Sequence, residues 1–104
     1  METKNWPDFA RGLSVELRNL RGGAPEVMKA FSALAQSALA QGALDGKTKE
    51  LIAVAISVAI RCDDCIAFHV KAAVDHGATR EEILETLGMA GYMGAGLAAK
   101  ADEA

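Results

Sequence analysis

The sequence predicts an all-α protein, a single domain of about five helices over residues 1–104. Three observations lead to this expectation. Alanine is abundant and aromatic residues make up only 5% of the chain, a composition that favours closely packed helices over sheets. Apolar residues recur at spacings of three and four, the period of a helix with one buried face. Proline and glycine stand where such helices would begin and end.

The first two helices are predicted from proline and glycine signals. Pro7 opens a helix that ends in the Arg-Gly-Gly segment 21–23, and Pro25 opens another that runs to about Ala40 and stops at Gly42. The apolar face of the first helix recurs every three or four residues: Phe9, Leu13, Leu17 and Leu20.

The third helix begins in the LDGKT segment, residues 44–48, and contains LIAVAISVAI, residues 51–60. This run is apolar nearly all round, with Ser57 the exception, and is too short to span a bilayer, which needs about 20 apolar residues. A helix that is apolar on every side must be covered on every side. In so small a domain, this indicates a partner subunit and therefore a homo-oligomer.

The fourth helix is expected from residue 63 or 64 to His76, followed by Gly77, a residue suited to a left-handed helix end. Thr79 and Glu82 have the spacing of a capping box, in which each side chain accepts a hydrogen bond from the other residue's backbone N–H. They open a fifth helix.

The GYMGAG run, residues 91–96, interrupts or extends this fifth helix, and Tyr92 is a candidate pocket residue. No strand precedes the glycines, so a dinucleotide-binding loop is not indicated. Close helix packing through small residues is the preferred interpretation.

Charge and composition exclude several classes of protein. The net charge is −3, and no basic cluster marks a nucleic-acid surface. The first twelve residues lack the basic and apolar regions of a secretory signal, so we expect a cytoplasmic protein without a membrane span. Two close cysteines in that compartment indicate redox or metal chemistry rather than a stabilising disulfide.

The most chemically loaded stretch is RCDDCIAFH, residues 61–69. On a helix, Cys62, Cys65 and His69 lie on one stripe. The positive end of the helix dipole stabilises a thiolate there, and a histidine one turn away can take up the thiol proton. The second cysteine can then close a disulfide with its oxidised neighbour.

Other interpretations of this stretch remain open. Asp63 and Asp64 disfavour a nearby thiolate, although acidic residues also suit the first turn of a helix. Zinc could use Cys62, Cys65, His69 and His76, but the loop that separates ligand pairs in a zinc finger is missing. A structural disulfide would close a very short loop, and the cysteines could simply be buried apolar residues.

From Glu50 onward the chain resembles the carboxymuconolactone decarboxylase and alkylhydroperoxidase-D-like family. The resemblance rests on Glu50, the CxxCxxxH motif formed by Cys62, Cys65 and His69, and the downstream segment HGATREEI. It implies an all-α multimer, often a trimer or hexamer, in which a dithiol reduces hydroperoxides. By this analogy Cys65 attacks the peroxide, Cys62 resolves the product to a disulfide, and His69 with Glu50 forms a proton relay.

The resemblance therefore implies a thiol-dependent hydroperoxide reductase that needs no cofactor or metal. Its partners would be a small hydroperoxide, an unidentified thiol or disulfide reductant and further copies of the chain. Asp64 stands where characterised hydroperoxidases often have a histidine, which puts efficient peroxidase activity in question. A general thiol–disulfide oxidoreductase and a non-catalytic redox-sensing oligomer are the alternatives. The decarboxylase branch generally lacks the CxxC motif, so lactone decarboxylation is disfavoured.

Glu50 presents a geometric problem, because it lies twelve residues before Cys62, which is ~18 Å along a straight helix. A relay with His69 therefore needs a chain reversal between crossing helices, or a glutamate from another subunit. Alternatively, Glu50 is a first-turn acid that stabilises the third helix. His76 is expected to act as a cation at the end of the fourth helix rather than as a metal ligand.

Overall fold

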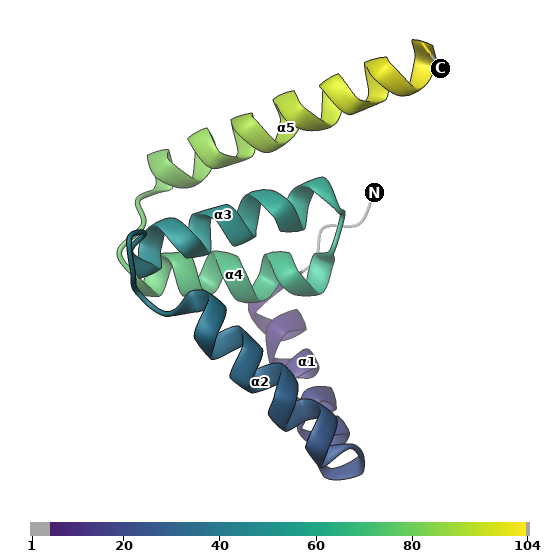
Figure 1. The fold of residues 1–104 in the computed structure, drawn as a ribbon, viewed down its shortest axis with the longest axis vertical. Coiled ribbons are helices and arrows are strands. Elements are labelled where there is room, and N and C mark those ends of the chain that lie inside the picture. Colours follow the sequence, from purple (N-terminus) through teal and green to yellow (C-terminus); the bar gives the residue numbers. More distant parts are fainter. Residues whose placement is uncertain (1–4, 104) are drawn as a thin grey trace.

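The computed structural model describes residues 5–103, with side chains described up to residue 94. The described chain contains five α-helices joined by short loops, as predicted, and no strand (Figure 1). The helices are α1 (Trp6–Gly23), α2 (Pro25–Leu39), α3 (Gly46–Ala59), α4 (Asp63–Asp75) and α5 (Arg80–Glu103). Within this described part, no helix is both long and apolar enough to cross a membrane.

Helices α3 and α4 form an antiparallel hairpin at the centre of the molecule (Figure 1). Helix α5 packs against α3 from one side, while α1 packs against α4 and α2 against α3. Helices α1 and α2 contact each other and project away from the central hairpin. The α3–α4 hairpin is therefore the scaffold on which any site must be built.

The core of the chain is small and rich in alanine. Val54 on α3 and Ala73 on α4 are fully buried, and Ala67 and Ala90 are nearly so. Because alanine has only a methyl side chain, it allows helix axes to approach closely, and the central hairpin uses this to pack tightly.

The predicted capping box is confirmed at the start of α5. The Thr79 N–H donates to Glu82 Oε1 at 2.8 Å, and the Glu82 N–H donates to Thr79 Oγ1 at 3.1 Å. Lys47 pairs with Glu82 at 2.9 Å and links α3 to α5. The Lys47 ammonium, with the Thr79 hydrogen bonds, holds the pKa of Glu82 below its usual range, and Glu82 in turn raises the pKa of Lys47. Gly77 has the expected positive φ, +88°.

Two polar residues define the turn between α2 and α3. Asp45 caps α3 by accepting a 2.8 Å hydrogen bond from the Thr48 N–H. Hydrogen bonds from Thr48 hold the pKa of Asp45 below its usual range. The Lys49 ammonium donates to the carbonyls of Ala38 and Ala40, where α2 leaves carbonyl groups without helical partners.

The glycine run 91–96 extends α5 rather than interrupting it. Gly91 and Gly94 do not mediate close helix packing within this chain, because a Cβ at either position would meet nothing within 4 Å, and packing against another copy of the chain stays a prediction. Tyr92 is exposed. The side chain of residue 96 lies outside the described residues.

Several apolar helix faces are not covered within this chain. Ile52 and Ile56 on α3 and Ile60 at its C-cap follow one another at four-residue spacing and are 44–64% exposed. Val27, Phe31 and Leu34 on α2 are also exposed. One side of the apolar third helix is therefore left uncovered by its own chain, and the homo-oligomer stays a prediction.

Candidate functional site: a dithiol beside a histidine–glutamate pair

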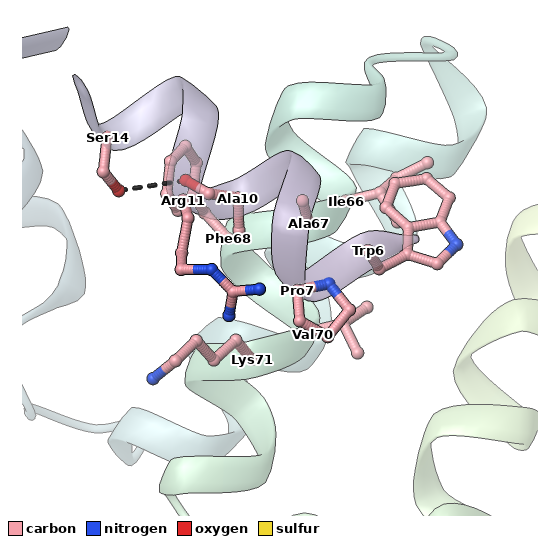
Figure 2. A pocket seen from close by; sticks show the side chains of 10 residues that line it. All are labelled: Trp6, Pro7, Ala10, Arg11, Ser14, Ile66, Ala67, Phe68, Val70 and Lys71. Carbon is pink, nitrogen blue, oxygen red and sulfur yellow. Dashed lines mark hydrogen bonds between the residues drawn. The ribbon is translucent and has the colours of Figure 1, made fainter. Parts of the chain in front are cut away.

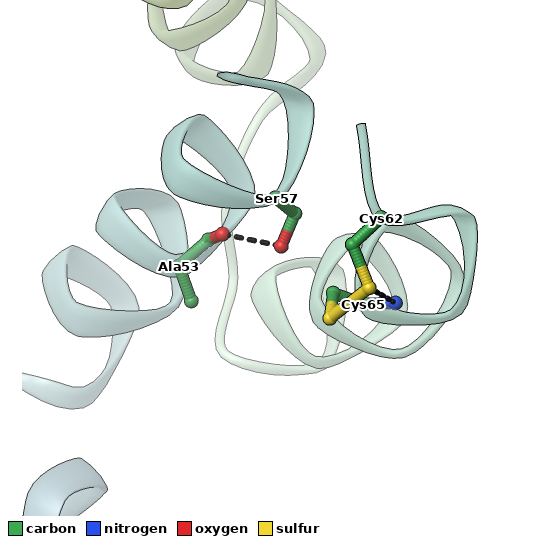
Figure 3. Close-up of a disulfide and its surroundings, with 4 residues drawn as sticks. All are labelled: Ala53, Ser57, Cys62 and Cys65. Carbon is green, nitrogen blue, oxygen red and sulfur yellow. Dashed lines mark hydrogen bonds between the residues drawn. A yellow bond between two sulfur atoms is a disulfide. The ribbon is translucent and has the colours of Figure 1, made fainter. Parts of the chain in front are cut away.

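Both cysteines lie at the start of α4 and are joined as a disulfide (Figure 3). Their Cα atoms are 5.3 Å apart. Cys62 is the N-cap residue of the helix, and its Sγ accepts a 3.3 Å hydrogen bond from the Cys65 N–H. The sulfur atoms thus lie at the positive end of the helix dipole, where a thiolate is favoured once the disulfide is reduced.

The turn that delivers Cys62 is a helix-ending motif of α3. The Cys62 N–H donates to the Ser57 carbonyl at 2.9 Å and the Arg61 N–H to the Val58 carbonyl at 3.1 Å, the two bonds of a Schellman motif. Arg61 occupies the left-handed position with φ of +58°, where glycine is usual. Cys62 therefore ends one helix motif and begins the next, which fixes its backbone from both sides.

Ser57 is a site neighbour that the sequence analysis did not assign. It is 3% exposed, and its hydroxyl donates to the Ala53 carbonyl at 2.6 Å. Figure 3 shows it on the turn of α3 that lies beside the disulfide. Its signal in the sequence was its position as the one polar residue of LIAVAISVAI, and its proximity to Cys62 comes from the helix-ending motif over residues 57–62.

Glu50 and His69 meet across the α3–α4 hairpin. Glu50 Oε2 lies 2.7 Å from His69 Nδ1, although the two residues are 19 positions apart. Glu50 is only 5% exposed, whereas the His69 side chain is 30% exposed. The chain reversal required by the sequence analysis is thus made within one chain. The first-turn interpretation of Glu50 is wrong, since the first turn of α3 contains no acid.

This pairing fixes how His69 can act. With Nδ1 facing a carboxylate, Nδ1 carries the proton of a neutral imidazole and Nε2 is the basic nitrogen. His69 follows Cys65 by one helical turn on the same stripe of α4. A buried carboxylate that orients an imidazole beside a thiol is the arrangement expected of an activated nucleophile.

The other candidate ligand, His76, is engaged elsewhere. It caps the end of α4, where its Nδ1–H donates to the Ala72 carbonyl at 2.8 Å. Its ring also packs on Gly46 at the start of α3, where a Cβ would lie 2.8 Å from a ring carbon. Within the described residues, no group of three or more histidine, cysteine and acidic side chains is placed to hold a metal ion.

Asp63 and Asp64 form the acidic first turn of α4, and both are exposed. This position suits their structural role, because first-turn carboxylates are stabilised by the helix dipole. It also places two negative charges beside the dithiol.

The fold and this arrangement define a class of protein: an all-α domain that carries a redox-capable cysteine pair beside a histidine–glutamate pair. The chain belongs to the carboxymuconolactone decarboxylase family, whose family model matches residues 25–102. The matched region contains the dithiol, His69 and Glu50. It begins at the first residue of α2, so α1 lies outside the match.

Solved structures support this assignment. A carboxymuconolactone decarboxylase family protein from Legionella pneumophila is 50% identical, with a TM-score of 0.85 over 90% of this chain and 84% of its own. A family member from Thermotoga maritima, for which a role in the antioxidative response has been suggested, is 36% identical. Its TM-score is 0.71 over 88% of this chain and 74% of its own.

Among curated proteins, an uncharacterized protein of Cupriavidus necator is 44% identical over 69% of this chain and 64% of its own length. An uncharacterized protein encoded in the cox locus of Paracoccus denitrificans is 47% identical over 75% of this chain and 69% of its own. The chain thus spans about two thirds of the length of these curated relatives.

Proposed function

We propose that this protein is a thiol-dependent hydroperoxide reductase that cycles between a Cys62–Cys65 dithiol and a disulfide. The observation that carries the proposal is the joint position of two groups on one helical hairpin. A bonded cysteine pair stands at the start of α4, and a histidine oriented by a buried glutamate lies one turn further on. The suggested antioxidative role of the Thermotoga family member agrees with this chemistry.

In the first step, His69 takes the proton of Cys65, and the thiolate attacks the terminal oxygen of the hydroperoxide. The O–O bond breaks, the sulfur becomes a sulfenic acid, and the alkoxide leaves as an alcohol with the proton that His69 returns. Glu50 stabilises the imidazolium that forms transiently.

In the second step, the Cys62 thiolate attacks the Cys65 sulfur, releasing the sulfenic oxygen as water and closing the disulfide. The hydrogen already on the sulfenic oxygen and the proton lost by Cys62 are the two hydrogens of that water. An external dithiol then reduces the disulfide by exchange and is itself oxidised.

The positions of the two cysteines at the start of α4 indicate which one attacks the peroxide and which one resolves the sulfenic acid. Cys65 is the cysteine four residues from His69, whereas Cys62 is held by the backbone of the preceding turn. Cys65 is therefore assigned as the attacking sulfur and Cys62 as the resolving one. The exposed isoleucine stripe of α3 supports a homo-oligomer as the working form.

Peroxide consumption with a dithiol reductant tests the proposal, with intact-mass analysis after a stoichiometric peroxide pulse. The wild type should lose two hydrogens as the disulfide forms, and Cys62→Ser should accumulate a sulfenic acid at Cys65. Cys65→Ser should lose turnover entirely. Turnover in Cys65→Ser at the wild-type rate would refute the assignment.

The same assay separates the alternatives. Disulfide exchange with protein or small-molecule disulfides, without peroxide consumption, would indicate a general thiol–disulfide oxidoreductase. Thiols that resist both peroxide and alkylation would indicate a non-catalytic oligomer.

A further inference from the structure

A cavity of about 670 Å³ lies between α1 and α4 (Figure 2). Its volume falls within the range of small-molecule sites. The lining comes from the two helices alone, and it includes Trp6, Arg11 and Ser14 of α1 and Ile66, Phe68 and Lys71 of α4.

Most of this cavity lies away from the dithiol. At about 100° per residue, Ala67 and Lys71 lie on the side of α4 opposite to Cys65 and His69, whereas Ile66 lies about 60° from His69 and directly follows Cys65 in the chain. Helix α1, which forms the other wall, also lies outside the region matched by the family model. The cavity therefore borders the site described above at Ile66 and extends away from it along α1.

Its lining is apolar apart from three residues. Trp6, Phe68 and Ile66 are the large apolar side chains, and they can enclose a hydrocarbon chain. Ser14 already donates its hydroxyl proton to the Ala10 carbonyl at 3.0 Å. Recognition of a charged group thus falls to Arg11 and Lys71.

Both titratable residues of the lining are cations. Figure 2 shows the Arg11 guanidinium and the Lys71 ammonium on the same side of the cavity, away from the indole of Trp6. Arg11 is paired with Asp8 and Lys71 with Asp75, but neither acid lines the cavity. The four side chains are 60–71% exposed, and solvent screening makes exposed ion pairs of this kind weak.

The two cations also keep donors to spare. A guanidinium has five N–H donors and an ammonium three, so one carboxylate partner does not exhaust either. A second carboxylate can join them without displacing Asp8 or Asp75. Two cations on one side, Trp6 and Ile66 on the other and Phe68 near Arg11 match an amphipathic anion.

We propose that the cavity between α1 and α4 binds a small aliphatic carboxylate. The carboxylate contacts Arg11 and Lys71, and the hydrocarbon chain lies against Trp6, Ile66 and Phe68.

The chain supplies its own probe, since Trp6 is the only tryptophan and lines the cavity. Titration of the full chain with octanoate should change the Trp6 emission saturably. Octanol, with the same chain and no charge, should bind at least tenfold more weakly, and octylamine should not bind. A purely apolar pocket would show the opposite order, because octanol is more hydrophobic than octanoate.

Two variants test the charges directly. Arg11→Gln with Lys71→Gln should weaken octanoate binding at least tenfold and leave octanol binding unchanged. Arg18→Gln, an exposed arginine of α1 outside the lining, is the matched control and should bind octanoate as the wild type does. Because the three substituted side chains are exposed, the variants should have the same helical circular dichroism spectrum as the wild type.

Three results would overturn the proposal. The first is octanol binding as tightly as octanoate. The second is a Trp6 signal that does not saturate with octanoate. The third is a Trp6 emission shift that depends on protein concentration without ligand, which would show that a second copy of the chain fills the cavity.

Discussion

Replacing Glu50 with glutamine tests the link between the buried carboxylate and the dithiol. Glutamine keeps the size of the side chain and a hydrogen bond to His69, but removes the negative charge 2.7 Å from Nδ1. Glu50 is 5% exposed, so solvent screens this interaction little. A hydrogen bond to a charged group contributes about 1.5–3 kcal/mol. If that energy stabilises the imidazolium formed during thiol deprotonation, peroxide reduction slows by about 10- to 150-fold.

The assay compares peroxide turnover and the alkylation rate of the reduced protein in Glu50→Gln and the wild type. Both rates should fall together, since both depend on the thiolate of Cys65. Glu85→Gln, an exposed acid on α5, is the control and should leave both rates unchanged. A folded Glu50→Gln protein with wild-type turnover would refute the reasoning. It would show that the glutamate only holds α3 against α4.

Four further outcomes follow from the local structure. Thr79→Ala removes half of the α5 capping box and should lower the free energy of unfolding by about 1 kcal/mol, measured by denaturant titration. Arg61→Gly relieves the left-handed backbone of a residue with φ of +58° and should raise stability by about 1 kcal/mol. The pKa of Glu82 is lowered from its ordinary value of 4.5, so its contribution is present at neutral pH and lost as pH falls below that range. Glu82→Gln should therefore flatten the decline of the melting temperature in acid. Ile56→Glu places a charge in the exposed stripe of α3 and should reduce the mass found by light scattering.

For each of these four predictions, one experimental outcome would contradict the reasoning. Arg18→Gly, in a right-handed helical position, should destabilise α1 by about 1 kcal/mol, and equal effects at Arg18 and Arg61 would contradict the backbone argument. No stability change in Thr79→Ala would mean that the box does not hold the start of α5. An unchanged acid profile in Glu82→Gln, or an unchanged mass in Ile56→Glu, would refute the corresponding inference.

Much of the fold was predictable because its signals are local. Prolines at the starts of α1 and α2, the Thr79–Glu82 box and Gly77 act on neighbouring residues, so the sequence alone located these helix ends. Whether the glycine run 91–96 breaks α5 or continues it was not predictable in this way. Glycine permits both a break and a continued helix, and the sequence contains no stop signal strong enough to choose.

The sequence by itself determined that Cys62, Cys65 and His69 share one helical stripe, because a period of 3.6 residues places them there. Only the tertiary structure decided that Glu50 meets His69 within one chain and that α1 closes a cavity against α4. These contacts join residues of different helices. Their geometry depends on how the α3–α4 hairpin turns and how its neighbours pack, which no short-range pattern in the chain specifies.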